Sequence, residues 1–532
     1  MEKGKKMTDG KLRRFARWAA ACGFGLLAAM GATAASAKTA QDELVIALAT
    51  DVRSLNGVGR DGPTDIVLHH IYETLVGFRA DLSVGPALAD SWDVSQDGTV
   101  YTFHLREGAK FHNGDPITSA DVKWSWNFHM DPARKVSCAP NFNGSRQIKL
   151  LSLETPDEHT VVFKIEKPSP LFLTRLAEIQ CNLWVACPKN VDESGAWKPD
   201  SAIGSGPFKF ESRAVGDNVV LTRFKDYVAS KAPASGYSGD RTALVDRLRF
   251  QIIPDATVQE VALKAGDVDV VYAVHPLRAR ELEAAGLKRS TSPALGWTTF
   301  LIQTNDPLLS NLKIRQAIAH AIDYKAIAKA RMADSATPNP SAVADSSPYF
   351  SDRFREWPDY DPEKARALLK EAGYKGELLV IQTNTRFLAM HDNAVMLQAM
   401  LMQVGINAQI ETLEWGTQLD RFNKGKFQMQ SFIWSPRLDP SLAYGSFLGD
   451  KVADPSNQWD NKEAEELYRQ SLTETDFAKR ADIFARMHAL MVQDIPIISV
   501  YYNSSNVVTG ANVEGFKTWP AENPIGWGVS KK

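Results

Sequence analysis

Two kinds of hydrophobic pattern alternate along this chain. Residues 44–48 form a short continuous apolar run, which is typical of a buried strand. Residues 101–105 alternate between apolar and polar positions, as a strand with one face in solvent does. Residues 314–322 instead carry apolar side chains three and four positions apart, the spacing of one helix face. Because strand and helix patterns alternate through most of the length, the sequence predicts an α/β fold.

Polar residues mark the ends of the predicted helices. Asp323 can cap a helix at 324–330, and Asp361 followed by Pro362 can begin another. Gly373 can end that second helix, because glycine accepts the left-handed conformation found at helix ends. The 532 residues are enough for two or three domains of this kind.

The first 37 residues differ from the rest of the chain. Seven basic residues precede an apolar run at 19–32, and Ala35-Ser36-Ala37 follows it. This order predicts a signal peptide over residues 1–37, cleaved near Ala37, and a periplasmic protein. Arg13-Arg14 leaves the twin-arginine route open beside the ordinary secretory route. No later segment is long and apolar enough to insert into a membrane after cleavage.

The net charge of the chain after residue 37 argues against two classes of partner. Residues 1–37 hold seven of the 61 Lys and Arg and two of the 63 Asp and Glu, so their removal leaves a net charge of −7. Such a surface argues against nucleic acid and anionic membranes as partners.

Cys138, Cys181 and Cys187 predict one disulfide and one thiol, with the pairing open. They match no zinc signature, the ten histidines are scattered, and no phosphate-binding glycine loop occurs, so no cofactor or metal is expected.

Several blocks of sequence carry a resemblance to a known family. The chain resembles the family 5 extracellular solute-binding proteins, the peptide and nickel receptors of ABC importers. The blocks that carry this resemblance are Leu88–Trp92, Tyr101–Arg106, Gly108–Phe111, Gly114–Pro116, Ile203–Phe208, Arg315–Ile318, Ala321–Asp323, Asp361–Ala365 with Gly373-Tyr374, and Asp494–Pro496. They span nearly all of the chain after residue 37.

The resemblance implies a two-lobed periplasmic-binding-protein fold with a hinge and an extra inserted subdomain. The first lobe, subdomain I, would combine residues 38–71, 202–293 and 504–532. Subdomain II would be the insertion at 72–201, and the second lobe, subdomain III, would run from 294 to 503. Ligands would be captured as the two lobes close about the hinge.

The resemblance also places the ligand site in the loop after Trp434. Peptide receptors usually carry an Asp there, which pairs with the α-amino group of the peptide, followed by Asp-Pro. This chain keeps Asp439-Pro440, but Arg437 stands near the expected acid. Arg386 lies near the position where dipeptide receptors bind a carboxylate. Since arginine attracts carboxylates and repels ammonium groups, Arg437 and Arg386 predict an anionic solute, although either could instead be a surface charge or a structural ion pair.

Aromatic and first-lobe residues complete the predicted site. Trp434 and Trp415 could form flat walls for the ligand or could belong to the core. Asp51, Arg53 and Asn56 follow the first strand and could contact the ligand from the other lobe.

These observations predict a transport receptor and not an enzyme. The expected protein is a monomer that captures a short peptide or a peptide-like anionic solute, such as an opine, and delivers it to ABC permease subunits. A nickel or nickel-chelate receptor is the alternative within the family. A secreted hydrolase is the alternative of another class, because a pair of catalytic carboxylates needs no fixed spacing.

Overall fold

The computed structural model describes residues 42–532 except 57–60, 135, 137, 180, 182 and 334. The predicted signal peptide and the choice of export route therefore lie outside the described residues. The two strands predicted first are present as β1 (Glu43–Leu48) and β6 (Val100–Leu105). No helix in the described part of the chain is long and apolar enough to cross a membrane.

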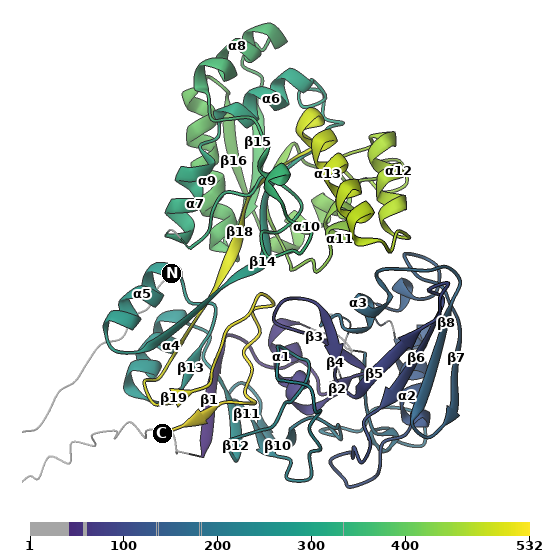
Figure 1. The fold of residues 1–532 in the computed structure, drawn as a ribbon. Helices are drawn as coiled ribbons and strands as arrows, with labels where there is room; N and C mark the ends of the chain where they lie inside the picture. Colours follow the sequence, from purple (N-terminus) through teal and green to yellow (C-terminus); the bar gives the residue numbers. More distant parts are fainter. Residues whose placement is uncertain are drawn as a thin grey trace, which may run out of the picture. The chain divides into compact units, whose positions relative to one another are not determined.

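Ten of the described strands form one mixed sheet (Figure 1). In spatial order they are β10 (Phe208–Ala214), β11 (Asn218–Arg223), β12 (Arg247–Ile252), β1, β13 (Val270–Val271), β18 (Ile497–Thr509), β14 (Lys288–Ile302), β17 (Met429–Trp434), β15 (Leu379–Asn384) and β16 (Ala408–Leu413). β1 runs parallel to β12 and β13, and β15 runs parallel to β16 and β17. We call β1 and β10–β13, with α1 (Gly62–Ile71), α4 (Ala256–Ala265) and α5 (Pro276–Ala284), the first lobe.

The second lobe is built on β15–β17 and the neighbouring halves of β14 and β18. Its helices are α6 (Leu312–Ala321), α7 (Tyr324–Met332), α8 (Pro362–Ala372), α9 (Leu388–Gln403), α10 (Trp415–Asn423), α11 (Pro440–Tyr444), α12 (Lys462–Ser471), α13 (Phe477–Asp494) and the short η4 (Asp352–Arg355). The predicted caps are confirmed: the Asp323 carboxylate accepts from Ala326 N–H, and that of Asp361 from Lys364 N–H. Gly373 ends α8 with a left-handed φ of 72°.

A separate sheet of four described strands, β5-β6-β8-β7, lies within the predicted insertion. The elements of this part are β2 (Glu73–Thr74), β3 (Val76–Phe78), β4 (Val84–Pro86), β5 (Ala89–Val94), α2 (Ser119–Met130), η1 (Pro132–Arg134), η2 (Ala139–Asn141), β7 (Leu150–Asp157), β8 (Thr160–Ile165), α3 (Phe172–Leu176), β9 (Trp184–Val185) and η3 (Pro188–Asn190). We call this part the insertion. Its aromatic core includes Trp126, Phe142 and Phe163, and it is continuous with the core of the first lobe.

β14 and β18 connect the two lobes. They pair antiparallel from Lys288 with Thr509 to Leu301 with Ile497, and the register shifts between Pro293 and Trp297. Both strands cross the predicted boundaries at 293/294 and 503/504, so single strands belong to both lobes. The exact division into subdomains stays a prediction.

The segment after β18 returns to the first lobe. β19 (Val513–Glu514) pairs with β20 (Ser530–Lys531). The Lys531 ammonium donates to Glu43 O at 2.9 Å and lies 3.1 Å from the Asp269 carboxylate, and both side chains of that ion pair are almost fully buried. Asp269 also accepts from Val45 N–H at 2.9 Å. Residues near positions 45, 269 and 531 are thereby joined in one buried cluster.

The structure selects one of the three cysteine pairings that the sequence leaves open. Cys138 and Cys181 form a disulfide with a Cα–Cα distance of 5.3 Å, while Cys187 is a buried free thiol. The disulfide ties the segment before β7 to the segment after α3 within the insertion.

Candidate ligand site

The loop that the resemblance singles out lies between β17 and α11. β17 is buried along most of its length, so the chain reaches the surface only at Ser435. Asp439 ends the loop and caps α11, because its carboxylate accepts from Ser441 N–H at 2.9 Å. The loop 435–439 is thus held at both ends by regular elements.

Asp439 is a structural anchor of this loop. It is 6% exposed, and its two carboxylate oxygens lie 2.6 and 2.7 Å from the guanidinium nitrogens of Arg480. The Ser441 hydroxyl donates to the same carboxylate at 2.6 Å. Both oxygens already have protein partners, so the structure gives Asp439 a positioning role beside the ligand role predicted from sequence.

Arg437 projects from the same loop and has only neutral hydrogen-bond partners among the described residues. Its guanidinium donates to the Ser435 hydroxyl at 2.8 Å, to Ser435 O at 3.1 Å and to the Ser446 hydroxyl at 3.3 Å. Burial lowers the pKa of Arg437, Glu178 opposes that shift, and Arg175 adds to it. A half-buried cation without a carboxylate partner is a group that an anionic ligand would stabilise.

Two residues of the insertion, Arg175 and Glu178, lie close enough to Arg437 to interact with its charge. Arg175 lies on α3, and its guanidinium is 2.6 Å from the Glu178 carboxylate. The Arg175 Nε atom is buried and has no hydrogen-bond partner among the described residues. Arg437 and Arg175 therefore carry two positive charges near the single negative charge of Glu178, which leaves an excess of one positive charge.

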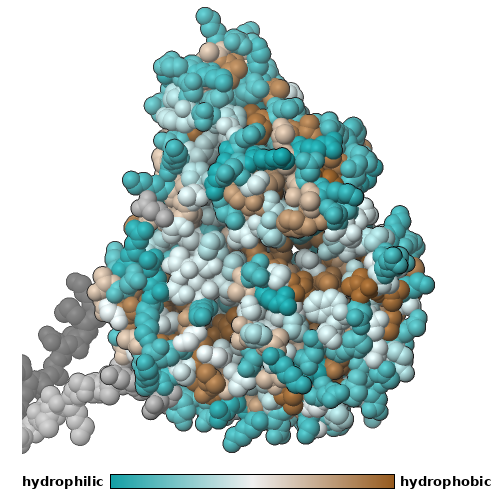
Figure 2. Space-filling view, viewed as in Figure 1, coloured by the Kyte–Doolittle hydropathy of each residue, from teal (hydrophilic) through white to brown (hydrophobic). Residues whose placement is uncertain are grey.

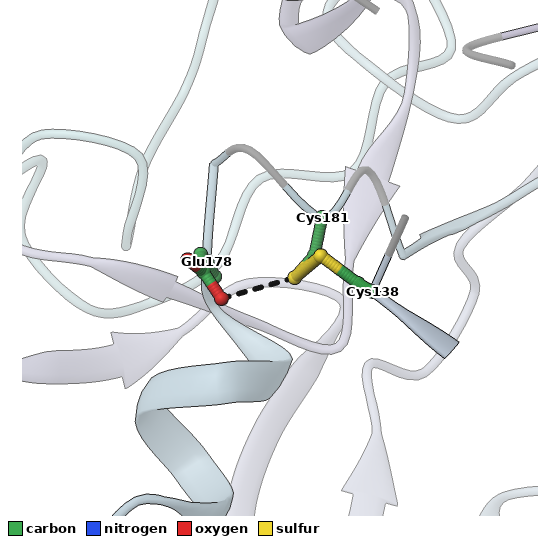
Figure 3. Close-up of side chains that lie close together, drawn as sticks. All are labelled: Cys138, Glu178 and Cys181. Carbon is green, nitrogen blue, oxygen red and sulfur yellow. Dashed lines mark hydrogen bonds between the residues drawn. A yellow bond between two sulfur atoms is a disulfide. The ribbon is translucent and has the colours of Figure 1, made fainter. Parts of the chain in front are cut away.

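Glu178 also contacts the disulfide (Figure 3). Its Oε2 atom is 3.0 Å from Cys181 Sγ. A disulfide sulfur carries no proton, so this close contact orients the side chain without a thiol hydrogen bond. Cys138, Glu178 and Cys181 lie within reach of one metal ion, but both sulfurs are bonded to each other and are not thiolate ligands.

Aromatic rings form a row beside the two predicted arginines. Trp434 is 6% exposed, and its indole N–H donates to the Thr299 hydroxyl at 3.1 Å. It packs on Phe432, whose ring centroid is 5.7 Å from that of half-buried Trp415. Trp415 contacts Phe387 in turn at 5.0 Å. Trp434 is thus mainly a core residue, whereas Trp415 keeps a partly open face.

The two predicted arginines lie at opposite ends of this row of aromatic rings. The guanidinium of Arg437 lies 5.7 Å from the Trp434 ring, and that of Arg386 lies 5.7 Å from the Phe387 ring. Arg386 is exposed on the turn after β15 and makes no ion pair with any described residue. The structure therefore connects Arg386, Trp415, Trp434 and Arg437 through Phe387 and Phe432.

The three first-lobe residues form their own contacts. The Asp51 carboxylate pairs with Arg213 at 3.1 Å and accepts from Gly216 N–H at 2.8 Å. Arg53 pairs with Asp61, the N-cap residue of α1, at 2.7 Å, and Asn56 is half-buried on the same loop. These contacts of Asp51 and Arg53 are local to the first lobe and do not join them to Arg437.

Apolar side chains gather across the middle of the face shown in Figure 2, over the region where Figure 1 labels α11 and β3. Leu438, half-buried beside Arg437, packs against the core shared by the first lobe and the insertion and against a core of the second lobe. Leu82, on the turn between β3 and β4, also packs against the second-lobe core. The loop with Arg437 thus lies where the two cores meet.

A depression of about 610 Å³ elsewhere on the second lobe holds none of the predicted residues. Its lining includes Gln303, Gln382 and Lys426. Lys451, in the same lining, already pairs with Asp460 at 3.2 Å. This depression is open and holds none of the predicted ligand residues, so we keep the half-buried Arg437 as the centre of the candidate site.

Comparison with known proteins decides the family. Residues 83–454 match the Bacterial extracellular solute-binding proteins, family 5 Middle. The chain belongs to this family. It is 26% identical over 489 residues to Heme-binding protein A of Haemophilus influenzae, covering 86% of each chain. It is 27% identical over 495 residues to the Dipeptide-binding protein of Pseudomonas aeruginosa, covering 87% of this chain and 89% of the relative.

A solved family 5 structure extends the comparison to the fold. The periplasmic binding protein DppA of Helicobacter pylori, in complex with the peptide STSA, has a TM-score of 0.75 and 25% sequence identity. The comparison covers 92% of this chain and 98% of that protein. The fold is thus the two-lobed periplasmic-binding-protein fold that the resemblance predicts. Family 5 is a family of solute-binding proteins, which agrees with the expectation that the chain is not an enzyme.

Sequence reasoning within family 5 missed Arg175 and Glu178. An Arg and a Glu three positions apart are common on helix surfaces and carry no signal of their own. The nearby Cys181 is the one local feature that could have drawn attention to Glu178, because its disulfide fixes the segment that follows α3. Their approach to Arg437 depends on tertiary contacts.

Proposed function

We propose that this protein captures a small solute bearing a carboxylate, such as a short peptide or an opine-like conjugate, and delivers it to the permease of an ABC importer. The observation that carries the proposal is the position of Arg437: a half-buried cation with neutral partners, in electrostatic range of Arg175 from the insertion. The relatives named for dipeptide binding support the peptide class.

The same geometry suggests how binding favours closure. Arg437 belongs to the second lobe and Arg175 to the insertion, so one carboxylate between them would contact both sides. A ligand shifts a conformational equilibrium only by its difference in affinity for the two states. A carboxylate held by both arginines would stabilise the closed state and relieve the repulsion between the two guanidinium groups. The protein would act as a periplasmic monomer.

Calorimetry with matched ligands tests the proposal. We expect Ala-Ala and related short peptides to bind, and C-terminally amidated forms to bind at least tenfold more weakly. Arg437→Ala should weaken binding by about 10- to 100-fold, the range for a charged hydrogen bond. Arg366→Ala is the matched control, because Arg366 is an exposed arginine on α8 paired with Glu363. Equal affinity of Arg437→Ala and the wild type would refute the assignment.

The two alternatives are tested in the same experiment. The segment 434–440 contains no histidine, so a nickel receptor would need ligands from elsewhere. Binding of Ni²⁺ or its histidine chelate in place of peptides would favour that alternative. Release of cleaved products from peptides or oligosaccharides would favour the hydrolase.

A further inference from the structure

Glu522 lies on the segment that connects β19 to β20. This segment runs beside the strands that join the lobes (Figure 1). Thr518 N–H donates to the Ser290 hydroxyl on β14 at 3.0 Å, and the Thr518 and Ser505 hydroxyls are 2.8 Å apart. Thr518 is therefore fixed to both connecting strands, four residues before Glu522.

A tight turn fixes the backbone of Glu522. Its N–H donates to Trp519 O at 3.0 Å, and the Trp519 indole N–H donates to Asn523 O at 2.8 Å. Trp519 is buried and packs on Tyr237 with 4.9 Å between ring centroids. Glu522 adopts φ 66°, in the left-handed region that costs a non-glycine residue of order 1 kcal/mol. The fold holds this glutamate in a strained conformation, and a glycine or asparagine would fit it more easily.

The carboxylate of Glu522 has no hydrogen bond or ion pair with any residue that the structure describes. The side chain is nevertheless partly accessible. Burial raises the pKa of Glu522 to about 7. An acid that is strained, desolvated and unpaired lowers stability, and such groups are concentrated at functional sites.

The turn that holds Glu522 is part of the large core that the first lobe and the insertion share. Trp519 and Ala521, on either side of Pro520, belong to the core of the first lobe and the insertion. Leu438 of the second lobe packs against that same core and directly follows Arg437. The loop with Arg437 and the turn with Glu522 thus each pack on this extended core, the first from the second lobe and the second from the first lobe.

We propose that Glu522 binds a positively charged group of the solute, most simply a primary ammonium. This inference rests on the proposed function and narrows it: the solute carries a cation as well as a carboxylate. Glu522 then supplies the acid that the Arg437 loop lacks, from a part of the chain far from that loop in sequence.

Retention of a random tripeptide library, in free and N-acetylated forms, tests this proposal. The wild type should retain the free-amine peptides at least tenfold better than the acetylated ones. Glu522→Gln keeps the side-chain shape and should lose that preference, and Glu193→Gln, an exposed acid on the insertion, should keep it. Arg437→Ala should bind both forms weakly.

Each outcome decides between the two proposals. Equal retention of free and acetylated peptides by the wild type, or an unchanged preference in Glu522→Gln, overturns the role of Glu522 and leaves the proposed function intact. Failure to retain any peptide overturns the peptide assignment and this inference with it. The melting temperature separates binding from structure: Glu522→Gln should melt at the same or a higher temperature, because it removes an unpaired desolvated acid, and a clearly lower one would identify Glu522 as a structural residue.

Discussion

Asp439 and Arg480 form a two-pronged ion pair inside the second lobe, with Oδ2 to Nη1 at 2.6 Å and Oδ1 to Nη2 at 2.7 Å. Their side chains are only 8% and 2% exposed. The pair holds the end of the loop from which Arg437 projects, so stability and ligand binding are coupled at this point.

Replacing Asp439 by Asn should lower the free energy of unfolding by about 3–5 kcal/mol, because a buried guanidinium is left without its carboxylate. Urea unfolding measures the change. Glu463→Gln is the control: Glu463 pairs with Arg486 on the exposed surface, and its loss should cost less than about 1 kcal/mol. Similar losses in the two variants would contradict the anchoring role of Asp439.

Arg386→Ala should weaken the binding of a carboxylate ligand by about tenfold or more with little change in melting temperature. Arg386 makes no ion pair with a described residue, so its removal breaks no charge pair of the fold, whereas a ligand would lose a charged hydrogen bond. Calorimetry and thermal unfolding of one preparation give both quantities. A drop in melting temperature without a change in affinity would assign Arg386 to structure.

Removing the disulfide should affect stability and binding together. The double change Cys138→Ser and Cys181→Ser opens a link between residues 43 positions apart, which the loop-entropy relation values at about 4 kcal/mol. It also frees the segment that positions Glu178, so affinity should fall. Cys187→Ser, which alters a buried thiol outside the disulfide, should leave affinity unchanged. Unchanged affinity in the double variant would show that Glu178 needs no such support.

Acid should destabilise the protein through its buried histidines. His70 donates from Nδ1 to Ile66 O and accepts at Nε2 from Gly526 N–H, so it is neutral in the fold, and burial lowers its pKa to about 3. The unfolded chain binds a proton near pH 6.5, so stability should fall as the pH drops from about 6.5 toward 3, by up to about 1.4 kcal/mol per pH unit. Burial also lowers the pKa of His112 and His129 to about 4.

Urea unfolding at pH 7, 6 and 5 measures this dependence. His129→Gln should weaken it, since glutamine cannot gain the proton that the unfolded histidine binds. A slope that is the same in this variant and the wild type would assign the acid sensitivity to other groups.

The sequence predicted the elements more securely than the site. β1, β6 and α8 follow from apolar spacing and local caps, which depend on neighbours within a few residues. Arg437 could be predicted as a ligand residue because its loop resembles the ligand-binding loop of family 5 receptors. The anchoring of Asp439 by Arg480 and the placement of Arg175 and Glu522 could not be predicted, because each depends on residues 41 or more positions away that only the folded chain brings near.

The buried ion pair of Asp269 and Lys531, together with the hydrogen bond from Lys531 to Glu43 O, also sets when the first lobe can be completed during synthesis. Lys531 donates to the carbonyl of a residue 488 positions earlier. At 5–20 residues per second, synthesis separates the two by roughly 25–100 s. Within that interval β1 can pair with β12 and β13 once those strands have been made, but the first lobe still lacks the segment that closes it. The first lobe is therefore begun early in synthesis and is completed only when the last residues of the given sequence have been made.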